Sequence, residues 1–306
     1  MQIKTPKKGK IMFKLKGVVP PMITPFDKKG NLDIENLEKL VTFLKDRVNG
    51  LYICGSYGSG PMMSVDERKK VTEVTVKIVN EKIPVVAHTG TTNTRDTVEL
   101  TQHAEEVGCE AAAAVGPYYF HHNEDSLLEF YGSMVKAVKP GFPIYVYHNP
   151  KFSGYGISLP TMKKLKALGI HGIKDATFDI LTFATYMREL ADDNFDIALG
   201  TEAMWLSARS LGGESFIPGL GNALPEICQK MFQEGMNNDF VACRETQFKV
   251  NELRDVMYLA KSTQLAIYAM LEIRGIIKAY PRLPFVPARE SEKEEIKKRL
   301  TELGEI

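Results

Sequence analysis

The chain has 306 residues, enough for one large domain or two ordinary ones. Charged residues make up 25% of it and the net charge is +1, so no strong field favours nucleic acid or an anionic membrane as a partner. The four cysteines form no CxxC pair and no cluster with zinc spacing, and no apolar run approaches the roughly 20 residues that cross a bilayer. We therefore expect a cytoplasmic protein in a reduced compartment.

The amino-terminal residues carry several lysines but lack the long apolar stretch of a signal peptide. We expect residues 1–15 to form a solvated tail that leads into the first strand. A nucleic-acid role for this tail is the alternative.

Short apolar runs then alternate with longer segments of helical period. Eight runs are predicted to be strands: 16–26, 50–55, 83–90, 109–119, 142–150, 170–174, 195–200 and 213–219. The alanines of the fourth run would also suit a helix.

Seven helices are predicted between these strands, at 33–48, 64–79, 93–108, 124–138, 158–169, 180–190 and 202–212. Asp33 can cap the first of them, and Ser64 with Glu67 has the spacing of a capping box at the second. After Leu224 the chain is predicted to be helical to its end.

Eight strand–helix alternations with short connections predict a parallel sheet of the α/β class. At this length they favour a (β/α)8 TIM barrel over an open doubly wound sheet or two separate domains. We expect the barrel to occupy residues 16–223 and a carboxyl-terminal helical region residues 224–306.

A lysine ends the sixth strand, where a TIM barrel carries its active site. Desolvation of Lys174 would lower its pKa from about 10.4 toward ~7–8, and a neutral amine can form a Schiff base with a keto group. The alternative is a strand-end lysine that reaches solvent or pairs with Asp175.

The glycine-rich segment after the second strand, "CGSYGSGP", lacks the pattern of a nucleotide-binding loop. Its glycines would expose successive N–H groups that suit a carboxylate, and Ser56 could relay a proton. The alternative is a turn without a ligand.

Tyrosines follow two further strands: Tyr118 and Tyr119 end the fourth, and Tyr147 ends the fifth. They could converge on the barrel mouth, although packing between barrel and helices is an ordinary use of such residues. His121 and His122 are adjacent and lack the spacing of a ligand pair, so we expect no metal site.

In chain order these motifs are Gly-Ser-x-Gly, Pro-Tyr-Tyr, Tyr-x-x-Pro and Gly-x-Lys-Asp. From about Lys16 to the end, the chain resembles the class I, Schiff-base aldolase superfamily that includes dihydrodipicolinate synthase and N-acetylneuraminate lyase. The resemblance implies an imine between Lys174 and pyruvate, with Tyr147 as general acid/base and no cofactor. It also implies that Ser56 links Tyr147 to Tyr119, which reaches across a dimer interface in a homotetramer.

The resemblance further implies that the N–H groups of Ser56 and Tyr57 hold the substrate carboxylate. Gly200 and Ile217 match positions that line the pocket. Tyr57 stands where members usually carry a smaller residue, and its role is unexplained.

Departures from the superfamily pattern bear on the substrate. Phe152 stands where dihydrodipicolinate synthases usually have an arginine for the carboxylate of the aldehyde. Of the acidic pair and serine that sialic acid lyases use, only Glu202 remains, since its neighbour is Ala203 and the serine position is Gly219.

The segments "GSGP", "GNALPE" and "YPRLPFVP" are more similar to 2-keto-3-deoxygluconate aldolases of the superfamily. We therefore predict a carbon–carbon lyase that splits a 2-keto-3-deoxy sugar acid into pyruvate and an aldehyde, or joins them. The alternatives are 4-hydroxy-tetrahydrodipicolinate synthase, N-acetylneuraminate lyase or a keto-deoxy acid dehydratase, and, outside catalysis, a barrel that only binds a 2-oxo acid.

Overall fold

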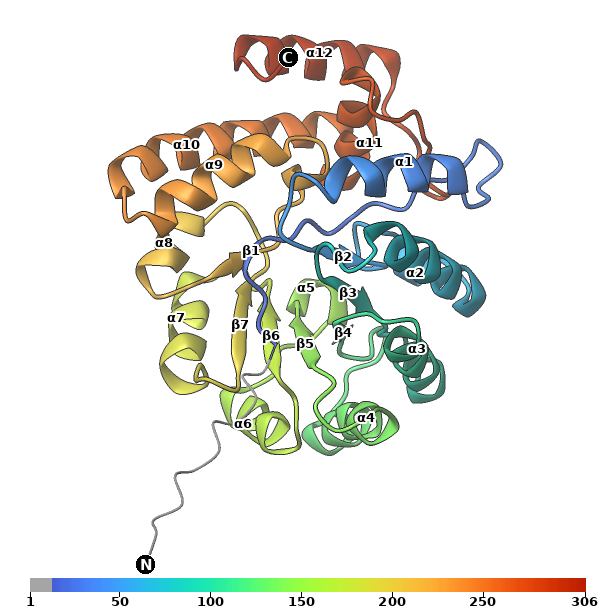
Figure 1. Ribbon diagram of the computed structural model, residues 1–306, viewed down its shortest axis with the longest axis vertical. Helices are drawn as coiled ribbons and strands as arrows, with labels where there is room; N and C mark the ends of the chain where they lie inside the picture. Colours follow the sequence, from blue (N-terminus) through green and yellow to red (C-terminus); the bar gives the residue numbers. More distant parts are fainter. Residues whose placement is uncertain (1–12) are drawn as a thin grey trace, which may run out of the picture.

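A computed structural model describes residues 13–306, so the predicted tail lies outside the described residues as far as residue 12. Within this part of the chain, eight parallel strands form one sheet in the order β1-β8-β7-β6-β5-β4-β3-β2 (Figure 1). They are β1 (Gly17–Val18), β2 (Leu51–Ile53), β3 (Val85–His88), β4 (Ala111–Val115), β5 (Ile144–His148), β6 (Gly172–Asp175), β7 (Asp196–Leu199) and β8 (Ser215–Phe216).

The sheet closes between β2 and the chain that follows β1. Pro21 forms a parallel bridge with Tyr52, whose N–H donates to Pro20 O at 3.1 Å while its own carbonyl accepts from Met22 N at 2.9 Å. The predicted (β/α)8 TIM barrel is therefore confirmed, and the open sheet is wrong. The first strand is much shorter than the predicted run 16–26.

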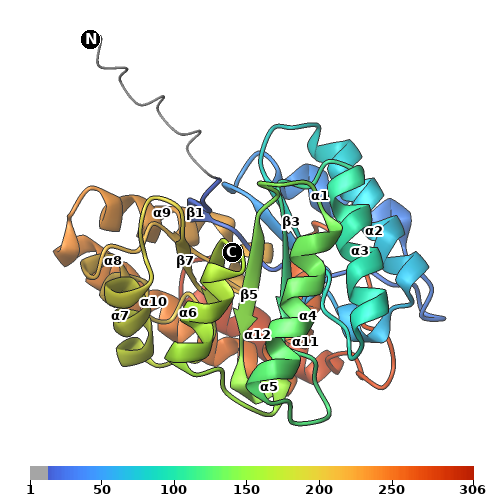
Figure 2. The same ribbon diagram turned by 90° about the horizontal axis from the view of Figure 1, so that it is seen from below.

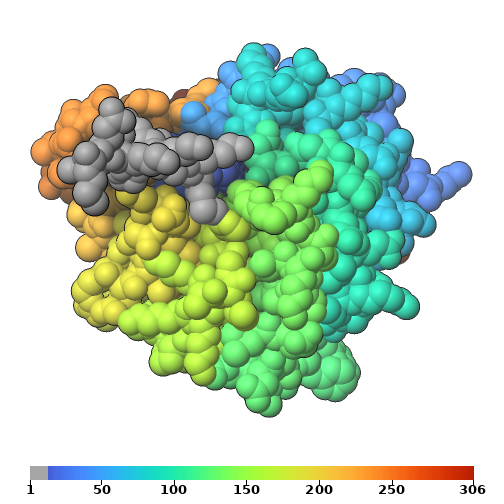
Figure 3. All heavy atoms as spheres, turned by 60° about the horizontal axis from the view of Figure 1, so that its bottom comes forward, coloured from blue at the N-terminus to red at the C-terminus, as the bar shows by residue number. Residues whose placement is uncertain are grey.

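Helices follow the strands and cover the outside of the barrel (Figure 2), and the colours of the atoms in Figure 3 follow the chain order around the face shown there. The amphipathic sequences predicted the positions of all of them except the four-residue α5, and the Asp33 cap and the Ser64–Glu67 capping box are both confirmed. The helices are α1 (Ile34–Leu44), α2 (Val65–Val79), α3 (Thr94–Glu106), α4 (Glu124–Ala137), α5 (Pro150–Ser153), α6 (Leu159–Ala167), α7 (Ile180–Glu189) and α8 (Trp205–Ser210).

The carboxyl-terminal region lies over one side of the barrel, next to α1 in Figure 1. It contains α9 (Pro225–Met236), α10 (Phe240–Met257), α11 (Thr263–Ile273) and α12 (Glu290–Glu302). Among the described residues, no helix combines the length and hydrophobicity that crossing a membrane requires.

The prediction of continuous helix after Leu224 is wrong for the segment between α11 and α12. Gly275 has φ +69°, and three prolines follow before α12, so the helix cannot continue. Instead Tyr280 forms an antiparallel bridge with Phe26. Arg282 donates two hydrogen bonds to Glu67 in the first turn of α2, at 2.8 and 2.5 Å.

Large and small side chains alternate inside the barrel, as a filled interior requires. Tyr52 and Tyr145 pack there with Ala111 and Ala113. A Cβ on Gly172 would lie 2.5 Å from the Tyr145 ring, so only glycine leaves room for that tyrosine. This packing fills the barrel below its carboxyl-terminal mouth.

Candidate active site

Lys174 lies on β6 at the mouth, and only 4% of the residue is exposed. Its Nζ is 3.8 Å from the ring centre of Tyr52 and 4.0 Å from that of Tyr147. Burial lowers the pKa of Lys174 from 10.5 to about 7, because these surroundings solvate an ammonium poorly. At neutral pH a large share of this amine is therefore uncharged and nucleophilic.

Asp175 does not pair with this lysine. Its carboxylate accepts hydrogen bonds from the N–H and the hydroxyl of Thr177, at 3.0 and 2.8 Å. Successive residues of a strand point to opposite faces, so the Asp175 side chain points away from the barrel interior, on the face opposite to that of Lys174. Both alternatives, a solvated lysine and a Lys174–Asp175 pair, are excluded.

Tyr147 is the neighbour of Lys174 in the β5–β6 register. Its phenol oxygen accepts a hydrogen bond of 3.0 Å from Asn149 Nδ2. Asn149 Oδ1 accepts from Phe152 N at 3.3 Å and caps α5, which holds the amide with its nitrogen toward the phenol. Burial raises the pKa of Tyr147, and hydrogen bonding by Ser56 and Asn149 partly offsets that rise.

A neutral histidine forms the next part of the wall. The His88 ring packs edge-on against Tyr147 with 5.8 Å between ring centres, and its Nε2 accepts from Val115 N at 3.0 Å. Burial, together with the positive charges of Arg68 and Lys174, lowers the pKa of His88. The ring therefore stays uncharged beside the amine.

The turn after β2 is folded tightly on itself. Gly60 N donates to Gly55 O at 3.0 Å, and a Cβ on Gly60 would lie 1.9 Å from Cys54 O. Only glycine fits this close approach. The N–H groups of Ser56 and Tyr57 take no part in the bond that closes the turn.

The two tyrosines after β4 point in different directions. Tyr118 packs against Val115, Tyr147 and Ala176 at the mouth. Tyr119 has φ +84°, is 85% exposed and places its ring against Phe120. The chain therefore brings Tyr118, rather than Tyr119, to its own Tyr147.

An ion pair closes the opposite side of the mouth. Glu202 follows β7 and is 1% exposed, and its carboxylate accepts from Arg254 Nη1 at 2.8 Å and from Gly219 N at 3.1 Å. Arg254 comes from α10, so the carboxyl-terminal region contributes to the mouth. The opposite charges of the pair largely cancel.

The remaining predicted pocket residues lie at three levels of the barrel. Gly200 N donates to Asp175 O at 2.6 Å, and a Cβ on Gly200 would lie 2.7 Å from that of Ala176. Ile217 packs in the interior layer below the mouth. Phe152 is 52% exposed on α5 at the rim.

The comparison with family models identifies the protein class. The model of the dihydrodipicolinate synthetase family matches residues 14–303. The chain belongs to the dihydrodipicolinate synthetase family. Members are Schiff-base-forming carbon–carbon lyases of the class I aldolase superfamily, and this chain is an enzyme of that class.

Relatives of several activities share this family fold. The 4-hydroxy-tetrahydrodipicolinate synthase of Methanopyrus kandleri is 30% identical, over 95% of this chain and 97% of that protein. A wild-type sialic acid aldolase from Ruminococcus gnavus superposes with a TM-score of 0.89 at 26% identity, covering 95% and 98% of the two chains. Dihydrodipicolinate synthase from Aquifex aeolicus gives 0.88 at 26% identity, with coverage of 95% and 98%.

The sequence analysis did not identify several residues that lie at the mouth of the barrel. Tyr52 and His88 lie within apolar runs and carried no signal of their own. Asn149 had a usable signal, because asparagine before proline is typical of a helix start. Arg254 could not be placed without knowing which face of α10 meets the barrel.

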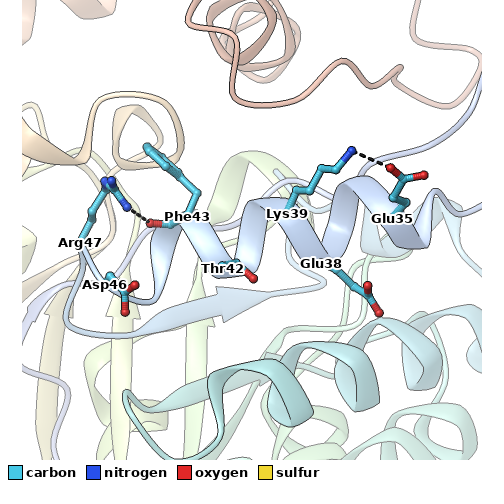
Figure 4. A pocket seen from close by; sticks show the side chains of 7 residues that line it. All are labelled: Glu35, Glu38, Lys39, Thr42, Phe43, Asp46 and Arg47. Atoms are coloured by element: carbon cyan, nitrogen blue, oxygen red, sulfur yellow. Dashed lines mark hydrogen bonds and ion pairs between the residues drawn. The ribbon is translucent and has the colours of Figure 1, made fainter.

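A hollow on the outer surface lies away from the mouth of the barrel. Figure 4 shows its lining side chains, all on α1 or directly after it. Within it Lys39 Nζ binds Glu35 at 2.6 Å, and Arg47 donates to Phe43 O at 2.8 Å. Its other ion pairs reach outside the helix, since Asp46 pairs with Lys82 and Arg47 lies 3.9 Å from Glu226.

Proposed function

We propose that this enzyme is a pyruvate-dependent aldolase that cleaves or forms a 2-keto-3-deoxy sugar acid through an imine on Lys174. The observation that carries the proposal is the enclosed Lys174 amine, whose pKa burial lowers to about 7, beside the phenol of Tyr147. An uncharged amine and a proton carrier at one carbonyl are the two groups that imine chemistry needs.

Imine formation begins when the Lys174 nitrogen attacks the C2 ketone of the substrate. The carbinolamine loses water, and the resulting protonated imine draws electrons from the neighbouring bonds. Tyr147 carries protons to and from the oxygen that leaves as water. The neutral His88 ring adds no second positive charge to this step.

Cleavage then breaks the C3–C4 bond. Tyr147, left as a phenolate when its proton went to the leaving water, accepts the C4 hydroxyl proton; the aldehyde leaves, and the bonding electrons form an enamine with the imine nitrogen. The enamine takes a proton at C3, and hydrolysis releases pyruvate and restores the Lys174 amine. Synthesis follows the same steps in reverse.

The Tyr147 phenol needs a route to exchange its proton. Asn149 donates to its oxygen, so the phenol proton is directed elsewhere, and Ser56 is the hydroxyl that receives it in this proposal. Tyr119 of a second copy would complete the relay, because in its own chain this side chain is exposed. The proposed assembly is a homotetramer made of two such dimers.

The carboxylate of the substrate is assigned to the N–H groups of Ser56 and Tyr57. They lie outside the bond that closes the turn, and successive N–H groups suit a small anion. Gly200 lets β7 pack closely against Asp175 and Ala176, and Ile217 forms the apolar floor.

The aldehyde partner is proposed to lack a carboxylate. Phe152 at the rim offers no charge to pair with one, and Arg254 is already neutralised by Glu202. This disfavours the reaction of 4-hydroxy-tetrahydrodipicolinate synthase, although relatives carry that name. Dehydration of a keto-deoxy acid and cleavage of N-acetylneuraminate would use the same lysine. These two reactions are tested in parallel with cleavage of the 2-keto-3-deoxy sugar acid.

Borohydride reduction in the presence of pyruvate tests the proposal directly. We expect an irreversible adduct on the peptide that contains Lys174, located by mass spectrometry, and none in Lys174→Met. Release of pyruvate from 2-keto-3-deoxygluconate, measured with lactate dehydrogenase, then tests the substrate class. Pyruvate plus aspartate semialdehyde, and N-acetylneuraminate, are the matched competing substrates.

An adduct without turnover of any of these substrates would favour a barrel that only binds a 2-oxo acid. An adduct on another side chain, or full activity of Lys174→Met, would contradict the mechanism.

A further inference from the structure

Tyr57 crosses the mouth from the end of β2 to the loop after β8. A Cβ added to Gly219 would lie 2.3 Å from the Tyr57 hydroxyl oxygen and 2.5 Å from its Cζ. The end of the tyrosine ring therefore rests directly on the Gly219 backbone. It occupies the volume that a side chain at position 219 would otherwise take.

Two residues of α11 hold Tyr57 in this position. Its hydroxyl donates to Thr263 Oγ1 at 2.8 Å, and its carbonyl accepts from Gln264 Nε2 at 2.9 Å. Gln264 also donates to Ser59 Oγ at 2.7 Å, which fixes the turn itself. Tyr57 is half-buried, so it forms part of a fixed wall at the mouth.

The same wall includes the ion pair. Gly219, on which Tyr57 rests, donates its N–H to Glu202, and Glu202 binds Arg254. Burial and the negative charge of Glu202 raise the pKa of Tyr57, so its hydroxyl stays protonated. The wall thus offers hydrogen-bond donors and acceptors with no net charge.

The distance available to a substrate beyond C4 follows from this arrangement. The reacting carbons lie at Lys174, between the β2 turn and β6. An aldehyde chain that extends from there toward β8 meets the Tyr57 ring. We propose that Tyr57 sets the length of the aldehyde, so that the site takes a short, uncharged hydroxyaldehyde such as glyceraldehyde or glycolaldehyde.

This inference rests on the proposed aldolase function, and it is tested by the ratio of kcat/KM for a long and a short aldehyde. The probes are erythrose and arabinose against glyceraldehyde, each condensed with pyruvate, and glyceraldehyde 3-phosphate tests charge. Tyr57→Ala removes the ring. We expect it to raise the long-to-short ratio at least about tenfold, the scale on which a pocket discriminates chain length.

Tyr57→Phe is the matched control, because it keeps the ring and removes only the hydroxyl. Its long-to-short ratio should stay within about threefold of the unchanged enzyme. Tyr57→Leu fills part of the volume of the ring, so we expect its long-to-short ratio to lie between those of the unchanged enzyme and Tyr57→Ala. This variant also replaces Tyr57→Ala in the test if Tyr57→Ala does not fold.

The inference is overturned if Tyr57→Ala or Tyr57→Leu leaves the ratio unchanged while pyruvate still forms the borohydride adduct. It is equally overturned if the unchanged enzyme uses arabinose as well as glyceraldehyde, or prefers the phosphorylated aldehyde. Absence of any pyruvate adduct in the unchanged enzyme would instead contradict the proposed function, so the two failures are distinguishable.

Discussion

Two buried polar clusters, one at each end of the barrel, differ in how their side chains are paired. At the amino-terminal end, the Asp196 carboxylate accepts from Tyr145 Oη at 2.8 Å and from Leu15 N at 2.9 Å. At the mouth, the Tyr52 hydroxyl has no hydrogen-bond partner among the described residues, and the Lys174 amine faces two aromatic rings.

Unpaired buried groups cost free energy of folding, whereas paired ones cost little. The hydrogen-bonded Asp196 cluster thus stabilises the fold, whereas burying the Lys174 amine costs stability and keeps the amine uncharged. Variants at each end and the pH dependence of the site should separate these two effects, and the four predictions that follow are ordered from the largest expected effect to the smallest.

Lys174→Met should give the largest change. Loss of the proposed nucleophile should lower kcat more than about a thousandfold. The same change should stabilise the fold by on the order of 4 kcal/mol at pH 7, because an amine whose pKa is held near 7 costs free energy to bury. Pyruvate release measures kcat, and thermal unfolding measures stability. A variant that loses both activity and stability would contradict the contrast between the two ends.

Tyr147→Phe and Tyr145→Phe compare two phenols on one face of β5. Loss of the Tyr147 proton carrier should lower kcat by about 10²–10⁴-fold with little change in stability. Tyr145→Phe should retain kcat but lose about 1–3 kcal/mol of unfolding free energy, because Asp196 loses a donor. Steady-state kinetics and urea unfolding of both variants decide the comparison, and equal kinetic losses would contradict it.

The pH dependence of imine formation should follow the Lys174 amine. Below pH 7 the neutral fraction of an amine with a pKa of about 7 falls about tenfold per pH unit, so trapping with pyruvate should slow by that factor and level off above pH 7. Burial raises the pKa of Tyr147 and Tyr52 and lowers that of His88, so these neighbours do not titrate there. A rate that stays constant from pH 5 to pH 8 would contradict the assignment.

Asn149→Ser should give the smallest effect of the four. Serine keeps a cap on α5 but removes the amide that donates to the Tyr147 phenol. We expect kcat to fall about tenfold with unchanged thermal stability. Asn149→Ala is the control: it should lose activity similarly and also about 1 kcal/mol of stability from the missing cap.

Local patterns in the sequence predicted most of the barrel. Alternating strand and helix periods, the Asp33 cap and the Ser64 capping box depend on neighbouring residues, so the sequence expresses them directly. Lys174 was found in the same way, since a lysine at the end of an apolar run stands out against its neighbours.

Features that join distant parts of the chain could not be predicted. The contact of Tyr57 with Gly219 and the pair of Glu202 with Arg254 depend on which faces meet after folding. The resemblance led us to expect Tyr119 to point away from its own chain, but the positive φ that gives this direction is one that its residue type does not favour. The break after α11 was marked by a glycine and prolines but was hidden by the apolar residues around them.

The contact of Arg282 with Glu67 has a consequence for how the enzyme matures. It links the start of α2, just after the Ser56 turn, to a residue 215 positions further along the chain. We expect a nascent barrel to lack this contact until Arg282 has been synthesised, so that the Ser56 turn becomes fixed late in folding.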